Sequence, residues 1–516
     1  MKTNHKFVTH GDQDEFEPAN WTMNMTARLP ARAPETKLSI LIVGAGFSGL
    51  VSALECWRNG HNVVGILDRN QGPLYTGDLI ILQPSALRFL VHWPDMLQEL
   101  DQDRVEAPVY YRKHTGEVIL GPTTPTYNDP EFLEERKGVP FAAPVQIRVK
   151  FYRMLLRQVA KIGLKVSYNQ QVVKYFEKED SGLGGVVTKD GSIHMAHLVV
   201  AADAFRSASE LLIAGEQMPT RSSGMSVYRT AFPTELALEQ EAFRKKWGDF
   251  VTAGGRGAKE YWLGPGMHLG LFVSPEVTAW GFTPRDQFLI PGGAEPVESW
   301  DADVDPESVI KVLERVPDWD PAAAAIIRAA PKGTVIHWPL LWRNLRPEWT
   351  SKGARVVQVG DCAHSNVPTS VSGGTMAIED AVTLAASLRI SCSAGEGRNA
   401  PLGARIYNLL RYQRVSCAQK MAFVNSQLLA ATDWTSIEKD PMQVRLRFPR
   451  WVFQHDPERY VYEKYGQAFA HLSQGTPFQN TNFPPGHKFK PWTIEQVHED
   501  IAAGKSAVDL LDGDWS

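Results

Sequence analysis

The stretch that decides the fold is LSILIVGAGFSG at residues 38–49. Residues 38–43 form a short apolar run, which is typical of a buried strand in a parallel sheet. Gly44, Gly46 and Gly49 follow at once with the spacing GxGxxG. Glycines directly after a buried strand predict a tight turn in which the backbone can approach a ligand closely.

The residues after the glycines complete a strand-helix-strand unit. Residues 50–57 have a spacing compatible with a helix, and residues 62–67 predict a second strand. That strand ends on Asp68, 19 residues past Gly49, with Arg69 beside it. In such a unit the helix N-terminus faces a pyrophosphate and the acid bonds a ribose hydroxyl. The unit predicts an adenine-dinucleotide site, and a plain turn between core elements is the alternative.

Composition and charge narrow the classes of partner. The chain has 516 residues, of which 43% are hydrophobic and 22% charged, and this length is typical of about three domains. The formal net charge is −4, so there is no electrostatic attraction for a polyanion. We therefore expect neither a nucleic-acid partner nor stable membrane insertion.

Cysteine usage and the N-terminal stretch indicate an intracellular protein. The widely spaced cysteines form no CxxC pair, which predicts neither a disulfide framework nor a bound metal. Residues 1–36 are polar and interrupted by prolines, so we interpret them as a flexible arm rather than a secretory signal. The longest apolar run, residues 40–54, is too short and too interrupted to span a bilayer. We expect a cytoplasmic location.

The chain changes character after the first unit. Residues 75–349 contain many short β-rich stretches and turn residues, which predict an inserted mixed sheet. Residues 147–162 and 306–330 interrupt it with helix-like patterns, and residues 405–428 are again helical. The chemistry of the last 85 or so residues is not evident from the sequence.

A second glycine-containing segment distinguishes between dinucleotide cofactors. Residues 354–359 predict a buried strand that leads into GDCAHSNVP at residues 360–368. Residues 370–374, SVSGG, then precede a helix predicted over residues 375–381. An acid at a strand end, a loop of small side chains and a helix N-terminus together favour an anionic group, which in a flavin is the N1/O2 edge of the reduced ring.

At this point the sequence resembles the single-component aromatic-ring-hydroxylating FAD monooxygenases, the salicylate hydroxylase and p-hydroxybenzoate hydroxylase family. The resemblance covers about residues 38–430, and residues 376–380, MAIED, are most similar to the salicylate hydroxylase branch. It implies that Asp361 bonds the ribityl chain of FAD and that Pro368 lies beside the flavin ring. The remaining cofactor contacts implied near this segment are Gly373 and Gly374.

Further segments support the resemblance, and two positions depart from it. Residues 77–84 look like the family's flavin-contacting loop, Arg148 like its arginine near FAD, and Asp203 like the acid near the pyrophosphate. The family usually has glycine where this chain has Ala204 and Val371. A missing glycine raises the cost of a positive φ and brings a Cβ close to the cofactor.

The resemblance implies an α/β fold with a Rossmann-like FAD-binding domain of the glutathione reductase type, an inserted mixed β-sheet substrate domain and a helical C-terminal part. The expected divisions are an arm (1–36), the FAD-binding domain (37–76, 145–215 and 350–400), the substrate domain (77–144 and 216–349) and the C-terminal region (401–516).

Four residues are candidates for contact with the substrate. Tyr228 and Arg229 match an aromatic-arginine pair of the family, so we expect Arg229 to anchor an anion and Tyr228 to donate a hydrogen bond. His268 matches a segment over the substrate cavity, and Asp78 lies in the expected flavin loop. The alternatives are a core tyrosine beside a surface arginine, a structural histidine, and a turn-capping aspartate. His364 is interpreted as structural or cofactor-side.

The implied activity is hydroxylation of a phenolic or aromatic-acid substrate through a flavin C4a-hydroperoxide, with oxidative decarboxylation as a variant. The implied reactants are FAD, NADPH or NADH as a transient reductant, O₂ and a small aromatic substrate, in a monomer or homodimer. Alternatives are an epoxidase or an oxygenase of an indole or prenylated metabolite, and a flavin-binding protein without turnover. A dehydrogenase is disfavoured by the GDCAH segment, and a halogenase by the lack of a WxWxIP segment.

Overall fold

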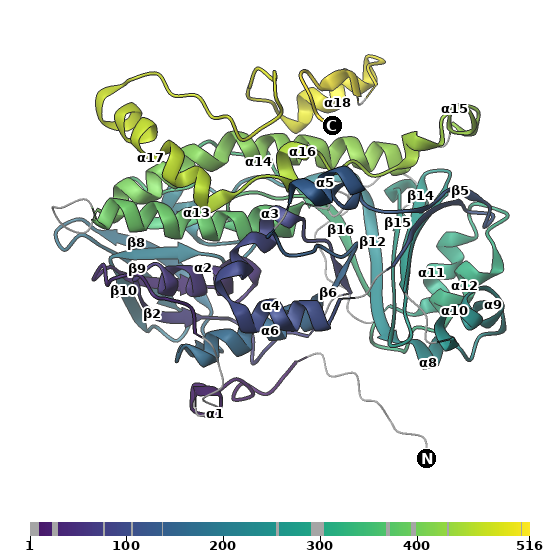
Figure 1. Ribbon diagram of the computed structural model, residues 1–516, viewed down its shortest axis with the longest axis horizontal. Coiled ribbons are helices and arrows are strands. Elements are labelled where there is room, and N and C mark those ends of the chain that lie inside the picture. The colour runs from purple at the N-terminus through teal and green to yellow at the C-terminus, as the bar shows by residue number, and fades with distance from the viewer. Residues whose placement is uncertain are drawn as a thin grey trace.

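The computed structural model describes most of the chain. The described residues are 10–22, 29–75, 78–104, 107–136, 138–253, 257–289, 304–367, 372–393, 399–430, 433–506 and 508–516. The two largest sheets lie at opposite ends of the molecule, and one long helix, α14 (Ala400–Ala430), runs from one end towards the other (Figure 1).

The first sheet is the predicted Rossmann-like core. Its strand order is β17-β11-β1-β2-β7, and every neighbouring pair is parallel. The strands are β1 (Ser39–Val43), β2 (Asn62–Leu67), β7 (Val166–Ser167), β11 (Leu198–Ala201) and β17 (Val356–Gln358). They come from three stretches far apart in the sequence, and apolar side chains bury both faces, as a parallel sheet requires.

Helices cover one face of this sheet and a small sheet covers the other. Helix α2 (Phe47–Arg58) follows β1 and packs beside α13 (Gly373–Ser393) and α6 (Arg148–Lys161). The opposite face packs on a three-stranded antiparallel sheet. Its strands are β8 (Val172–Lys178), β9 (Leu183–Thr188) and β10 (Ile193–Ala196).

The second large sheet has seven strands in the order β16-β12-β15-β14-β13-β4-β5. The strands are β4 (Val109–Lys113), β5 (Val118–Thr123), β12 (Arg221–Pro233), β13 (Ala258–Gly264), β14 (Met267–Val273), β15 (Val277–Pro284) and β16 (Ile336–Trp342). Only the β13–β4 pair is parallel, so the predicted mixed sheet is confirmed. A two-stranded ribbon, β3 (Leu79–Ile80) with β6 (Gln146–Ile147), lies between the two large sheets.

One predicted helix is divided in two. The helix-like pattern over residues 306–330 forms α11 (Pro306–Leu313) and α12 (Pro321–Arg328). Pro317 and Pro321 separate them, because proline lacks the backbone N–H that a continuing helix needs. The apolar faces of both helices pack on one face of the seven-stranded sheet.

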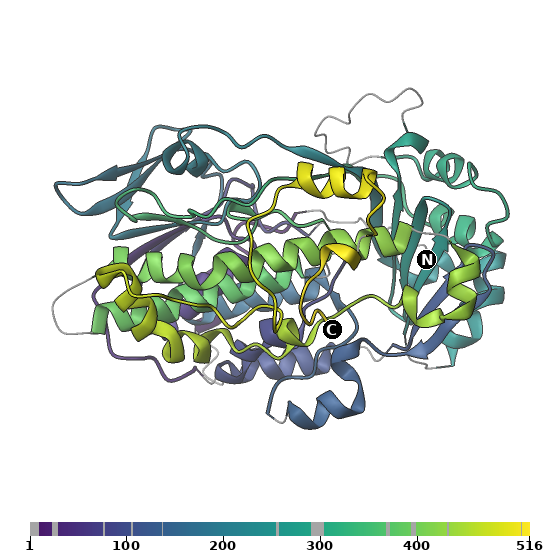
Figure 2. The ribbon, with the colours of Figure 1, turned by 90° about the horizontal axis from the view of Figure 1, so that it is seen from above.

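The helical C-terminal part connects the two ends of the molecule. Helix α14 (Ala400–Ala430) runs along α13 and extends to β13 and β14 (Figure 2). Helices α17 (Pro457–Gln474) and α18 (Ile494–Ala502) follow it. No helix in the described ranges is long and apolar enough to cross a bilayer.

The remaining helices are short or lie at the periphery. They are α1 (Pro18–Thr22), α3 (Pro84–Leu87), α4 (Pro94–Gln102), α5 (Pro130–Glu135), α7 (Ser209–Ile213), α8 (Thr234–Ala237), α9 (Glu241–Phe243), α10 (Asp249–Thr252), α15 (Trp434–Lys439) and α16 (Arg450–Phe453).

The described part of the expected N-terminal arm is folded onto the protein. Residues 10–22 include α1, which packs on α6. The Tyr75 hydroxyl donates to Glu15 at 2.6 Å, and Arg153 forms an ion pair with the same carboxylate. This stretch therefore differs from a flexible arm, because its polar residues have specific partners on α6 and in the loop after β2.

A buried ion cluster joins α13 to α14. Glu379 and Asp380 on α13 face Arg411 and Arg414 on α14, and all four side chains are at most 1% exposed. Arg411 Nε lies 2.7 Å from Asp380 Oδ1, and Arg414 Nε lies 2.8 Å from Glu379 Oε2. Burial alone would raise the pKa of Glu379, but the two guanidinium groups outweigh it and hold the pKa well below its usual range.

Removing one cation from this cluster tests its importance. We expect Arg411→Ala to destabilise the protein by about 3–5 kcal/mol, because it leaves buried carboxylates without a partner. Thermal melting monitored by circular dichroism measures the change. The control is Arg459→Ala, which removes an exposed pair with Glu463 and should leave the melting temperature nearly unchanged. Equal losses in both variants would contradict the assigned role.

Candidate active site

The three glycines of the first loop have separate structural reasons. Gly44 has φ +103°, and a Cβ there would meet the carbonyl oxygen of Ala202. A Cβ at Gly49 would meet the carbonyl oxygen of Gly44, so this glycine allows α2 to pack tightly on the loop. Gly46 differs, because apart from its own neighbours in the chain no protein atom lies within 4 Å of the position a Cβ would take. The space in front of Gly46 is therefore free for a ligand.

The surroundings of this space fit the pyrophosphate and ribose of FAD. Gly46 is the N-cap of α2 and no side chain caps the helix, so its first amides can bind an anion. Asp68 at the end of β2 accepts from the amides of Ala45 and Asn70, each at 2.8 Å. These bonds orient the carboxylate at the predicted ribose position, and Arg69 beside it is exposed.

The loop after β11 carries the expected acid and the unusual alanine. The Cys362 thiol donates to Asp203 Oδ1 at 3.3 Å, and burial raises the pKa of this carboxyl. Ala204 has φ +71°, in the left-handed region that favours glycine. The backbone therefore adopts a conformation that favours glycine, and the chain accepts the conformational cost of alanine there.

The GDCAH segment presents Asp361 to a cavity. Asp361 follows β17 in a tight turn, and its side chain is exposed into the cavity. His364 is fully buried, and its Nε2 lies 2.6 Å from Asp380, so it holds the turn rather than contacting a substrate. Gly373 and Gly374 at the start of α13 line the same cavity. Pro368 and Val371 lie outside the described residues.

The cavity lies between the seven-stranded sheet and the segments expected to contact the flavin. Its volume is about 350 Å³. It brings together most of the predicted site residues near the flavin ring, namely Asp78, Arg148, Arg229, His268, Asp361, Gly373 and Gly374. These residues come from the seven-stranded sheet, the turn after β17, the residue before β3, and the first turns of α6 and α13.

Arg229 and Asp78 form an ion pair in this cavity. Arg229 Nη1 lies 3.2 Å from Asp78 Oδ1, and its guanidinium carbon lies 4.1 Å from the ring centre of Trp338. Arg148 lies nearby over the ring of Phe47, at 5.3 Å. Burial lowers the pKa of Arg148, and the positive charge of Arg229 lowers it further.

His268 also lines the cavity and is uncharged at neutral pH. Burial lowers its pKa to about 4, with a smaller contribution from Lys259. Its Nδ1 is buried and has no hydrogen-bond partner among the described residues. His268 can thus offer a hydrogen bond to a ligand, but a charged imidazolium is not available there.

Tyr228 does not reach the cavity, so the predicted hydrogen bond from it to a substrate is not supported. Neighbouring residues of a strand point to opposite faces, and Arg229 takes the cavity face of β12. Tyr228 instead lies in the core under the sheet, where its ring stacks on Phe282 and His337 at 6.3 and 4.4 Å. Here the alternative of a core tyrosine is the better description.

The sequence reasoning missed two cavity residues on β13, Lys259 and Tyr261. The Lys259 side chain lies over the Tyr261 ring, with Nζ 4.8 Å from its centre. Burial lowers the pKa of Lys259 to about 8, although the Asp78 carboxylate opposes this shift. The available signal was a lysine in the strand AKEYWLG, which is rich in apolar and aromatic residues, because such a charge needs a reason to be buried.

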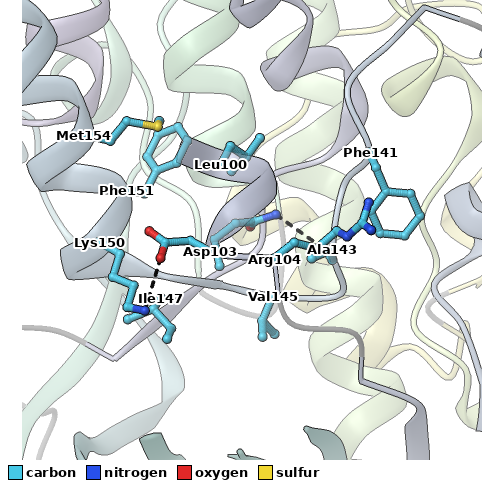
Figure 3. A pocket seen from close by; sticks show the side chains of 11 residues that line it. Leu100, Asp103, Arg104, Phe141, Ala143, Val145, Ile147, Lys150, Phe151 and Met154 are labelled. Carbon is cyan, nitrogen blue, oxygen red and sulfur yellow. Dashed lines mark hydrogen bonds and ion pairs between the residues drawn. The ribbon is translucent and has the colours of Figure 1, made fainter. Parts of the chain in front are cut away.

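A second, smaller hollow shares Val145 with the cavity (Figure 3). It lies beside α6, and Lys150 on its wall lies 3.2 Å from Asp103. Its volume of about 30 Å³ has room for a water molecule but not for an aromatic ring. The larger cavity is therefore the candidate active site.

Two alanine substitutions separate cofactor binding from folding. We expect Gly46→Ala to fold normally and to lose FAD, because the added Cβ occupies space intended for the pyrophosphate. Gly49→Ala should lower the melting temperature of the apoprotein itself, because its Cβ meets the Gly44 carbonyl. Flavin absorbance and melting of the apo forms measure the two effects. A Gly46→Ala protein that retained full FAD content would contradict this assignment.

Comparisons with known proteins identify the family of the chain. The family model described as FAD binding domain matches residues 37–403. The chain is 64% identical to the FAD-dependent monooxygenase AacuC of Aspergillus aculeatus and 62% identical to an FAD-dependent monooxygenase of Claviceps purpurea, over 99% of each chain. The crystal structure of CtdE in complex with FAD and a substrate has a TM-score of 0.74 at 22% identity, covering 85% of this chain and 100% of CtdE. The chain therefore belongs to the FAD-binding-domain family of FAD-dependent monooxygenases.

Proposed function

We propose that this enzyme hydroxylates a phenolic or aromatic-acid substrate, using NAD(P)H and O₂. The observation that supports the proposal is the charge of the cavity. Three cations line it, Lys259 and Arg229 from the sheet and Arg148 from α6, against two carboxylates, Asp361 and the Asp78 that pairs with Arg229. This excess of cations favours an anionic ligand such as a phenolate or a carboxylate.

The residues of the chain bind and polarise the substrate. FAD, when bound, supplies the activation of O₂ with electrons from NAD(P)H. Asp78 holds the Arg229 guanidinium, and Arg229 attracts the anionic oxygen of the substrate. Neutral Lys259 can take the proton of a phenol at Nζ, since its pKa is about 8. The resulting phenolate enriches the ring with electrons, and the apolar walls exclude water.

Removing Arg229 tests the anchor. We expect Arg229→Ala to keep its FAD and to lose coupled product formation by about 10–100-fold, which corresponds to one charged hydrogen bond of about 1.5–3 kcal/mol. Product mass and NAD(P)H consumption under air, measured on phenolic acids, give the coupling. The control is Arg221→Ala on the same strand, where the arginine is exposed and paired with Glu495. Loss of FAD in Arg229→Ala would make Arg229 a cofactor or folding residue instead.

The pH dependence of substrate binding separates the two substrate classes. A carboxylate binds the charged form of Lys259, so its affinity should fall up to tenfold per pH unit above about 8. A phenol donates its proton to neutral Lys259, so its affinity should rise as the pH increases to about 8. Dissociation constants are measured from flavin spectral changes between pH 6 and 9.5. They show whether the affinity rises up to about pH 8 or falls above it.

The Lys259→Met variant is the control for this profile. In this variant neither the rise nor the fall in affinity around pH 8 should be present. It should also raise the melting temperature of the apoprotein at pH 7, because the lowered pKa means that keeping Lys259 charged costs stability below pH 8. If the affinity of Lys259→Met still changed with pH around 8, the titration would belong to another group.

A further inference from the structure

The floor of the cavity contains two neighbouring glycines. Gly270 on β14 and Gly281 on β15 are cross-strand partners, and both line the cavity. Both are partly exposed, whereas Leu269 and Leu271 on either side of Gly270 are fully buried in the core beneath. We infer that this glycine pair selects a planar substrate of at least two fused aromatic rings, an inference that rests on the proposed function.

The glycine pair lies at the centre of a row that crosses four strands. Gly281 pairs with Arg229 on β12, and Gly270 pairs with Tyr261 on β13. Three interstrand spacings place the outer two backbones about 14 Å apart. The row thus has a cation at one end, a flat centre without side chains, and an aromatic ring at the other end.

Packing within the protein does not require glycine at either position. A Cβ at Gly270 would have Lys259 Nζ and the Tyr261 ring as its nearest neighbours, at 3.8 Å. A Cβ at Gly281 would have Arg229 Cβ and Asp78 Oδ2 as its nearest neighbours, at 3.9 Å. These are ordinary contact distances, and neither glycine has a positive φ.

Glycine inside a strand is unfavourable by roughly 0.5–1 kcal/mol relative to alanine. Two adjacent glycines that the fold does not need therefore indicate that another molecule approaches the backbone there. Lys259 Nζ supplies positive charge beside Gly270, and Arg229, which pairs with Asp78, extends from the strand next to Gly281. A flat, extended ring system with anionic oxygens at its edges matches this arrangement, and a single ring would leave part of the surface uncovered.

Two ligands that differ only in ring number test the inference. Salicylate and 3-hydroxy-2-naphthoate carry the same hydroxyl and carboxylate on one ring and on two fused rings. We expect the holoenzyme to bind the naphthoate about tenfold more tightly or better, measured as a dissociation constant from flavin absorbance changes. Gly270→Ala should weaken naphthoate binding by about tenfold or more, because one methyl group fills the flat surface, and should change salicylate binding by about twofold or less.

Several comparisons keep the outcome clear. Gly466→Ala on α17, where a Cβ would have no neighbour within 4 Å, is the matched control and should bind both ligands as the parent does. FAD content and melting temperature check folding, and Gly281→Ala repeats the test from the neighbouring strand. Equal affinities in the parent enzyme, or equal losses for both ligands in the glycine variants, would overturn the inference while leaving the proposed function in place. If neither ligand bound and no phenolic compound stimulated NAD(P)H oxidation, the proposed function would fall with it.

Discussion

The Asp380 carboxylate is the group on which the geometry of the active site depends. It accepts hydrogen bonds from the backbone amide of Gly360 at 2.9 Å and from Arg411 Nε at 2.7 Å. His364 Nε2 lies 2.6 Å from the same carboxylate. These contacts join the turn that carries Asp361 to α13 and α14. Because the cluster is completely buried, each charge relies on the others, and the turn has little freedom to move.

The seven-stranded sheet gives the enzyme two different surfaces at once. Side chains on one face pack with α11 and α12 into an aromatic core, and those on the other face line the cavity. The alternation of side chains along each strand makes this possible without any extra element. The same alternation explains why Arg229 reaches the cavity while Tyr228 stabilises the core. The buried cation Lys259 and the strand glycines Gly270 and Gly281 lower the stability of the fold. Residues of this kind are typical of binding sites, where function is favoured over stability.

Sequence patterns located the loops of the expected cofactor site, because the determinants of these loops are local. The spacing of Gly44, Gly46 and Gly49 reports backbone geometry within one turn, and Asp361 follows its strand directly. The substrate half was predicted in part. Arg229, Asp78 and His268 do line the cavity, but Lys259 was missed, because its meaning depends on which strands are neighbours. Residues 10–22 likewise found partners that no local pattern indicates.

The sequence by itself determined the α/β class, the dinucleotide loop and the family resemblance, since these depend on short-range periodicity and on glycine conformation. Only the tertiary structure decided which side chains share the cavity and which lie behind it. Strand order and register bring Arg229, Gly281, Gly270 and Tyr261 into one row from positions 52 residues apart at most. Pairing between strands is a long-range choice, made by the burial of whole faces rather than by any single segment.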